Sequence, residues 1–185
     1  PDPSRIYPAK EFSAEEFESP WYVKSLKADK VWKEYGITGK GVLNVIHDSN
    51  FVLSDSILEN RYSNPKEKPN GKDDSGNGLI DDLQGYDFFL KRPQLTRKPI
   101  PEEGSSSPRL LHGHQCVAII CGRGTGTSPH VFGLAPESQW AGVLAYQRIE
   151  AAVEWAIEQG ADTYSMSFSR ANLREYRSHW RKIME

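Results

Sequence analysis

The sequence contains no long hydrophobic run and no marked excess of charge of either sign. No stretch of its 185 residues approaches the roughly 20 apolar residues of a membrane-spanning helix, so we expect no membrane span. Lysine and arginine together number 23, against 25 aspartates and glutamates, and the basic residues form no stripe. A nucleic-acid-binding surface is therefore not predicted either. The mean hydropathy of -0.63 is low, but a hydrophobic fraction of 37% suffices for one globular domain with long polar loops.

Cysteine is also scarce. The two cysteines, Cys116 and Cys121, lie five residues apart within one predicted helix, a spacing poorly suited to a disulfide. Two thiols do not indicate a cellular compartment. The pattern favours two small buried hydrophobic side chains over a redox or metal-binding role.

Predicted strands and helices alternate along the chain. Near-continuous apolar runs predict buried strands, and apolar residues at helical spacing before a glycine predict helices. The predicted strands are 42–46, 84–89, 139–146 and 163–168, and the predicted helices are 27–35, one starting at 112, 149–159 and 173–185. Residues 1–20 are expected to form an extended arm, and residues 63–83 a polar loop. The alternation predicts an α/β fold over residues 21–185, with a doubly wound, mostly parallel sheet and helices on both faces.

Asp48 and His112 are the first side chains that suggest chemistry. Asp48 follows the first buried strand, at the edge where parallel sheets bind ligands, although an aspartate in Asp-Ser-Asn is equally suited to a turn. His112 opens an apolar helix, where a histidine can act as a general base or simply pack or cap the helix. Gly113 favours the catalytic interpretation, because it lets another backbone approach closely. Such an acid and base are two thirds of an acid–base–nucleophile triad.

Five motifs in order resemble the catalytic domain of the subtilisin-like serine proteases, or subtilases. The motifs occupy residues 21–48, 112–122, 133–138, 153–162 and 165–168. The resemblance implies an α/β subtilisin-like fold in which Asp48 and His112 are the catalytic acid and base. It further implies that Ser167, Phe168 and Ser169 bind the substrate backbone. It also implies an exported or extracellular protein that acts on polypeptides.

Two elements of the family have no counterpart in the 185 residues. They are the asparagine of the oxyanion hole and the nucleophilic serine of Gly-Thr-Ser-Met-Ala. Ser128 lies in a segment that echoes the serine motif, but it directly precedes Pro129, so no helical turn can follow it. The chain is therefore expected to be the N-terminal portion of a catalytic domain, completed by a C-terminal segment that carries the serine. His47, which precedes Asp48, should point to the opposite face of the sheet.

The polar loop contains a candidate calcium site. Residues 73–84 fit the twelve-residue calcium-loop template at several positions, with Gly78 at the turn. The predicted ligands are Asp73, Ser75, Asn77 and Asp81. Gln84 replaces the bidentate glutamate of the template, so a solvated loop rich in turns is an equally open alternative.

Two classes of function follow from these patterns. The first is a serine endopeptidase of the subtilisin type, with a polypeptide substrate and the serine supplied by the complementing segment. The second is a non-catalytic subtilase-like module that binds a peptide or a partner. The presence of both Asp48 and His112 favours the first, because a binding module needs neither residue.

Overall fold

The computed structural model describes residues 20–51, 59–96, 112–123, 132–145 and 148–167. Most of the expected N-terminal arm, the expected helix 173–185, and Ser128, Phe168 and Ser169 lie outside these residues. The described elements follow one another as α1 (Trp21–Ser25), α2 (Ala28–Tyr35), β1 (Leu43–His47), β2 (Gly85–Asp87), α4 (His112–Cys121), β3 (Gln139–Leu144), α5 (Ile149–Glu158) and β4 (Thr163–Met166). Strands and helices thus alternate from β2 onward, as the sequence predicts.

The four strands form one parallel sheet in the order β2-β3-β1-β4. β1 and β3 are buried along their whole length, as expected of central strands in a parallel sheet. β1 pairs with β3 from Leu43 opposite Gln139 to His47 opposite Val143, and with β4 from Asn44 opposite Thr163 to His47 opposite Met166. This register brings the carboxyl ends of three strands to one edge of the sheet.

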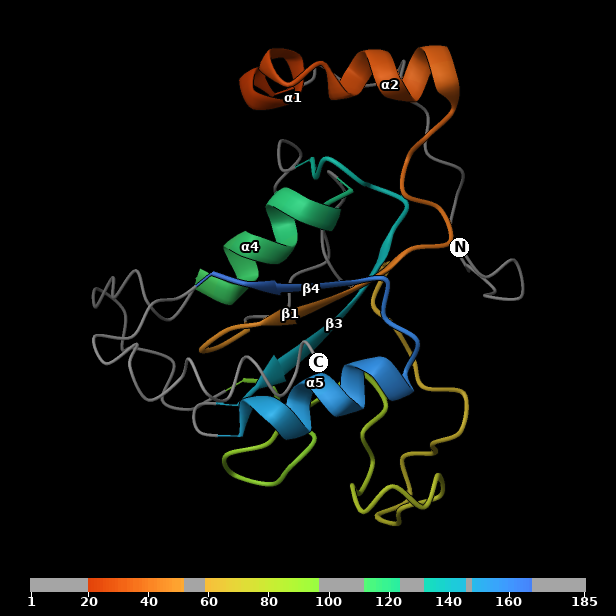
Figure 1. Cartoon of the computed structure of the whole chain (residues 1–185), viewed down its shortest axis with the longest axis vertical. Coiled ribbons are helices and arrows are strands. Elements are labelled where there is room, and N and C mark those ends of the chain that lie inside the picture. Colours follow the sequence, from red (N-terminus) through yellow and green to blue (C-terminus); the bar gives the residue numbers. More distant parts are fainter. Residues whose placement is uncertain (1–19, 52–58, 97–111, 124–131, 146–147, 168–185) are drawn as a thin grey trace.

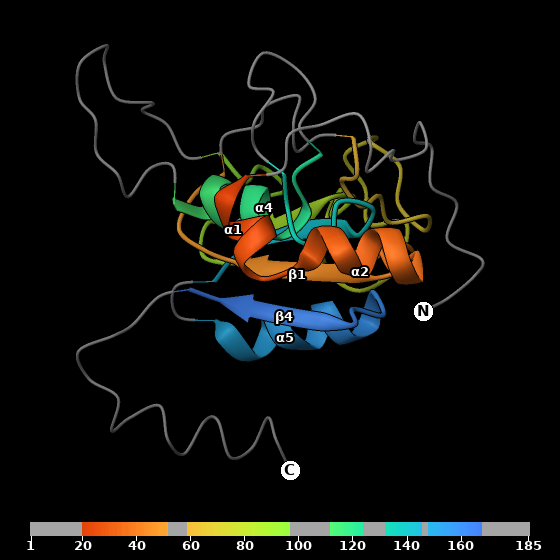
Figure 2. The ribbon, with the colours of Figure 1, turned by 90° about the horizontal axis from the view of Figure 1, so that it is seen from above.

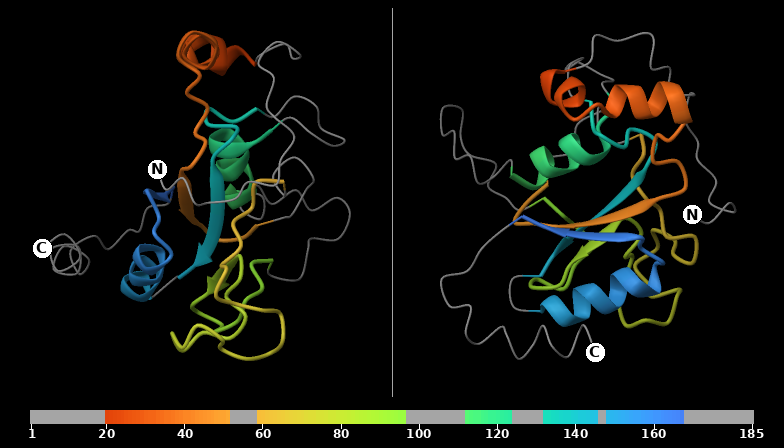
Figure 3. Two further views of the ribbon diagram at one scale, coloured as in Figure 1. Left: turned by 90° about the vertical axis from the view of Figure 1, so that its right-hand side faces the viewer. Right: turned by 45° about the horizontal axis from the view of Figure 1, so that its top comes forward.

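Helices cover both faces of this sheet, so the fold is the predicted doubly wound α/β arrangement. In Figures 1 and 3, α4 lies on one side of the strands and α5 on the other, with α1 and α2 beyond α4. Leu43 and Val45 of β1 pack in one core cluster with Ala152 and Trp155 of α5. Ile46 instead belongs to the cluster that contains Val117, Ala118 and Cys121 of α4. Alternate side chains of β1 therefore serve opposite cores.

α1 and α2 form a small layer of their own. Val23 and Trp32 are buried against Phe132, and the Trp32 indole donates a hydrogen bond to the Leu134 carbonyl at 3.1 Å. The sequence predicted α2, which ends at Gly36 in a left-handed conformation (φ 65°). It did not predict α1, because five residues are too short to show a helical period.

β4 lies at one edge of the sheet, as Figure 2 shows. It pairs with β1 on one side, and no other strand in the described part of the chain pairs with its second edge. Thr163 is exposed, and the side chains from Tyr164 to Met166 are only half-buried. This edge of the sheet is therefore much less covered than β1 and β3.

No helix among the described residues has the length and apolar character needed to cross a bilayer. The segment 63–83 contains no helix or strand, as predicted for a polar loop.

Candidate active site

Asp48 extends directly from the carboxyl end of β1. Its backbone N–H donates to the Val143 carbonyl at 3.1 Å, which continues the pairing of β1 with β3 by one residue. Asp48 lies two residues after Ile46, so the pleat directs its side chain toward the α4 face of the sheet. The carboxylate is buried, with 2% of the side chain exposed. The strand thus holds Asp48 at the edge where the sequence predicts a site.

His112 is the first residue of α4, and the packing of α4 on the sheet fixes its place. Val117, Ala118 and Cys121 anchor the helix in the core. Gly113 lies so close to the chain after β1 that a Cβ atom there would be 2.4 Å from the Asn50 carbonyl oxygen. The predicted role of Gly113 in close backbone approach is therefore confirmed. Only glycine allows α4 to bring His112 this near to Asp48.

The two side chains meet as predicted. Nδ1 of His112 lies 2.8 Å from Oδ2 of Asp48. The other carboxylate oxygen accepts hydrogen bonds from the Ser49 backbone N–H at 2.7 Å and the Ser49 hydroxyl at 3.1 Å. These bonds hold the carboxylate in an orientation that can accept a hydrogen bond from Nδ1–H of His112, and this tautomer leaves Nε2 with its lone pair. The imidazole is 42% exposed, so a reacting group from outside the described residues can reach it.

His47 points to the opposite face, as predicted. It is 2% exposed, and its Nδ1 lies 3.0 Å from the Tyr164 hydroxyl, with the two rings packed edge to face. Burial raises the pKa of Tyr164 far above its ordinary value, so this hydroxyl stays protonated at neutral pH. His47 therefore belongs to the core between β1 and β4 and takes no part in the site.

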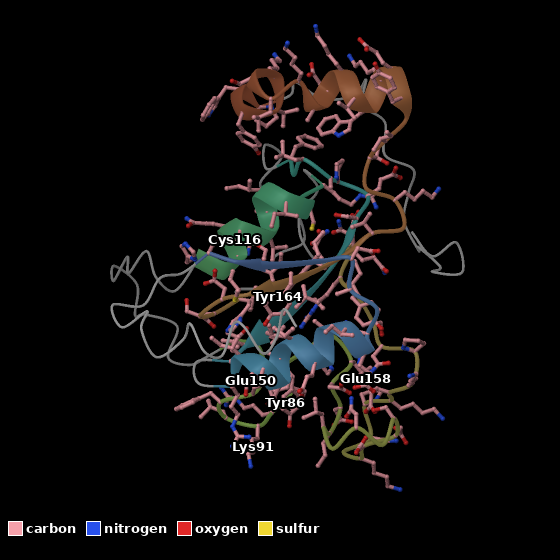
Figure 4. All side chains as sticks on the ribbon, viewed as in Figure 1. Tyr86, Lys91, Cys116, Glu150, Glu158 and Tyr164 are labelled. Carbon is pink, nitrogen blue, oxygen red and sulfur yellow. The ribbon has the colours of Figure 1, made fainter. Side chains whose placement is uncertain are left out.

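Cys116 is a member of the site that the sequence interpretation missed. Its sulfur lies 3.6 Å from Oδ2 of Asp48 and 3.8 Å from Nδ1 of His112. The ligand atoms of these three residues all lie within 4.8 Å of one another, a group that could hold a metal ion. Figure 4 shows Cys116 on α4. Its position four residues after His112 puts both side chains on one helix face, and that spacing was the available signal.

The two cysteines therefore differ. Cys121 is fully buried in the core, as predicted, and its burial raises its pKa to about 12. Burial also raises the pKa of the half-buried Cys116, whereas a hydrogen bond from Ser167 opposes the rise and the charge of Asp48 adds to it. Both thiols are consequently protonated at neutral pH.

Alkylation by iodoacetamide should show this protonation. Because the pKa of Cys116 is raised above the ordinary 9.0, its thiolate fraction and labelling rate should still increase about tenfold per pH unit between about pH 7 and pH 9. Mass spectrometry of the native chain measures the rate. The Cys116→Ser variant should lose the labelling, because Cys121 is shielded in the core. A rate that levels off below about pH 8 would contradict the raised pKa.

Only one of the three predicted substrate-binding residues is described. Ser167 follows β4 directly, one residue beyond the pairing of His47 with Met166, and is therefore level with Asp48 across the sheet. It is exposed and also bonds to the sulfur of Cys116. Phe168 and Ser169 lie outside the described residues, so their substrate-binding role stays a prediction.

The predicted calcium ligands occupy two neighbouring turns. Asp73 accepts hydrogen bonds from the backbone N–H groups of residues 76–78 and from the Ser75 hydroxyl at 3.3 Å. The Asp81 carboxylate instead binds the N–H groups of residues 70 and 71. The Asn77 side chain bonds to Asp82 and to the Leu79 N–H. Each of the four predicted ligands has a side-chain oxygen, the ligand atom that calcium prefers, so the residue types suit the ion chemically.

Comparison with a protein-family profile identifies the family to which the chain belongs. The sequence profile of the subtilase family (Peptidase_S8) matches residues 39–185, a span that contains both Asp48 and His112. The chain belongs to the subtilase family, the family of subtilisin-like serine proteases. The resemblance of the sequence motifs to this family is thereby confirmed.

Two crystal structures of MycP1 are similar to the fold, both at 18% sequence identity and a TM-score of 0.47. One is of MycP1 with its N-terminal propeptide removed, and the other is of MycP1 from the ESX-1 type VII secretion system. The matches cover 85% and 86% of this chain but only 41% and 38% of the MycP1 chains, so the chain spans about two fifths of their length. A search of curated protein sequences found no match.

Proposed function

We propose that this chain supplies the acid and the general base of a serine endopeptidase of the subtilisin type. The observation that carries the proposal is the 2.8 Å contact between Asp48 and His112 in a chain of the subtilase family. The anchoring of both residues by β1 and α4 supports it, because a general base must be held in place. A module that only binds peptides would need neither the buried carboxylate nor the exposed imidazole.

The reaction would be acyl transfer. Nε2 of His112 takes the proton of a serine hydroxyl as that oxygen attacks the peptide carbonyl, and later gives the proton to the leaving amine. Asp48 keeps the proton of the neutral imidazole on Nδ1 and stabilises the imidazolium that forms. The Ser49 bonds to Asp48 keep the carboxylate aligned during this change. The extended substrate would pair as an added strand beside Ser167, Phe168 and Ser169.

The serine and the oxyanion donor would come from a complementing C-terminal segment. The second edge of β4, which pairs with no strand among the residues the structure describes, supports this proposal, because parallel sheets are normally covered by other elements. A further strand and helix placed there would add their side chains next to Asp48 and His112. We also propose that the protein is exported, on the strength of its family membership.

A serine-directed fluorophosphonate probe tests the proposed function. The 185-residue chain alone should neither react with the probe nor cleave a fluorogenic peptide, because an acyl-enzyme needs a serine nucleophile and an oxyanion donor. Addition of the complementing segment should produce labelling on a serine of that segment. Labelling of Ser128 in the isolated chain would show instead that the nucleophile lies within these residues.

We further propose that the polar loop binds a structural calcium ion, with Asp73, Ser75, Asn77 and Asp81 as the ligands indicated by the template. The ion would neutralise the carboxylates of the loop and hold its turns together. It would have no part in the transfer of protons at His112.

A further inference from the structure

Asp48, His112 and Cys116 together present the three kinds of ligand atom with which proteins bind zinc, namely oxygen, nitrogen and sulfur. These atoms all lie within 4.8 Å of one another. Among the residues that the structure describes, no other three histidine, cysteine, aspartate or glutamate side chains bring their ligand atoms so close together. The proposed proteolytic mechanism uses the carboxylate and the imidazole of this group but gives the thiol no role.

The distances within the group suit a tetrahedral zinc ion. With zinc bonds of about 2.3 Å to sulfur and about 2.0–2.2 Å to nitrogen and oxygen, tetrahedral angles place the sulfur about 3.5 Å from each of the other two ligand atoms. The sulfur of Cys116 lies 3.6 Å from Oδ2 of Asp48 and 3.8 Å from Nδ1 of His112. Nδ1 and Oδ2 would separate from 2.8 Å to about 3.4 Å, a shift that a small rotation of the 42% exposed imidazole supplies.

The surroundings of the group favour zinc over the hard cations. Ser49 holds Oδ1 of Asp48 with two hydrogen bonds and leaves Oδ2 directed at the imidazole and the thiol, as outer contacts orient the ligands of a metal. A carboxylate and a thiolate balance the charge of a divalent ion, which matters because the Asp48 side chain is only 2% exposed. Imidazole and thiolate suit zinc, whereas calcium and magnesium prefer oxygen ligands alone.

We propose that Asp48, His112 and Cys116 form a zinc site through which the metal reversibly inhibits the protease. Zinc would bind Oδ2, Nδ1 and the sulfur, and a water molecule would reach the fourth position along the exposed side of the imidazole. On binding, the thiol releases its proton to the solvent, and the proton of the neutral imidazole moves from Nδ1 to Nε2. His112 then has no lone pair with which to accept the proton of a serine. The inhibition rests on the proposed function, whereas the binding of the ion does not.

Cobalt(II), a coloured substitute for zinc, tests the binding on the 185-residue chain without any proteolytic activity. Titration with cobalt should produce a charge-transfer band from the Cys116 thiolate and the visible bands of a tetrahedral ion. Added zinc should remove both by competition. Calcium should remove neither, because it is a poor match for nitrogen and sulfur.

Three variants assign the ligands. Cys116→Ser should lose the charge-transfer band and bind zinc more than about 100-fold more weakly, since a direct ligand contributes more than an outer-shell partner. His112→Ala should weaken zinc binding similarly, and it serves if circular dichroism shows that Cys116→Ser does not fold. His114→Ala is the matched control and should bind zinc like the wild type. It removes an imidazole of the same helix at a spacing of two residues from both ligands, which faces neither of them.

The inhibition is measured on the chain combined with the segment that carries the serine. Zinc at ten times its Kd should lower kcat for a fluorogenic peptide about tenfold, with little change in KM, because the ion occupies the general base and not the substrate-binding strand. Phenanthroline, which binds zinc in preference to calcium, should restore the activity. In Cys116→Ser, the same zinc concentration should leave kcat at the value that this variant has without zinc.

The outcomes separate the zinc site from the proposed function. Absence of a thiolate band in the wild type at saturating cobalt, or its persistence in Cys116→Ser, would overturn the site and leave the protease proposal standing. Wild-type sensitivity to zinc in Cys116→Ser would place the inhibitory ion elsewhere and overturn the inference. A thiolate band in the isolated chain, with no hydrolysis by the complemented chain in the absence of zinc, would support the site and overturn the proposed function.

Discussion

Replacing His112 by alanine should lower kcat/KM of the complemented protease by about 10⁴- to 10⁶-fold. The variant has no group that can take the proton of the serine, although the rest of the site is intact. His47, which precedes Asp48 in the sequence, points into the opposite core and cannot replace His112. The measurement is the hydrolysis of a fluorogenic peptide by the chain combined with the segment that carries the serine.

Asp48→Asn should lower kcat/KM by about 10⁴-fold while preserving the fold. An asparagine amide can donate to Nδ1, and the imidazole would then carry its proton on Nε2, where it cannot accept another from the serine. His114→Ala is the matched control, since it removes an imidazole from the same helix at a spacing of two residues, which does not face His112. Retention of wild-type activity by His112→Ala would show that the two residues are structural and that the proposed mechanism is wrong.

The second large effect concerns association of the isolated chain. Without its complementing segment, the chain should form dimers or larger species, because β4 leaves one edge without a described partner and its side chains half-buried. Exposed strand edges readily pair with other chains. Light scattering over a dilution series measures the association, and addition of the complementing segment should return the chain to a one-to-one complex.

Two variants test whether the edge is responsible. Met166→Lys places a charge on the half-buried face of β4 and should reduce the association. Ile157→Lys changes an apolar residue on α5 that is already 70% exposed, and should have no such effect. A compact monomer at every concentration, with cooperative unfolding, would contradict the prediction and show that the chain closes its own core.

The order of the elements could be predicted because the responsible signals are local. The apolar run before Asp48 and the helical spacing after Ile149 each depend on a few neighbouring residues. A short, continuous apolar run is typical of a strand buried on both faces, so its assignment to a central strand was straightforward. The ends of the elements were less accurate: β1 begins and ends one residue later than predicted. α1 was missed, since it is stabilised by the contact of Val23 with Phe132, more than 100 residues away, and not by a pattern of its own.

The sequence by itself determined the subtilase motifs, the α/β fold, and the identity of Asp48 and His112 as a candidate acid and base. These depend on residue type, spacing and order, all of which can be read from the sequence without a structure. Only the tertiary structure decided that Cys116 lies against both of these residues and that the buried Asp82 accepts a hydrogen bond from the Trp155 indole of α5. Contacts of this kind arise when distant segments pack together; the spacing of Cys116 from His112 indicates a shared helix face but not the contact with Asp48. The contact of Cys116 with Asp48 is therefore a property of the fold, whereas the catalytic motifs are a property of the sequence.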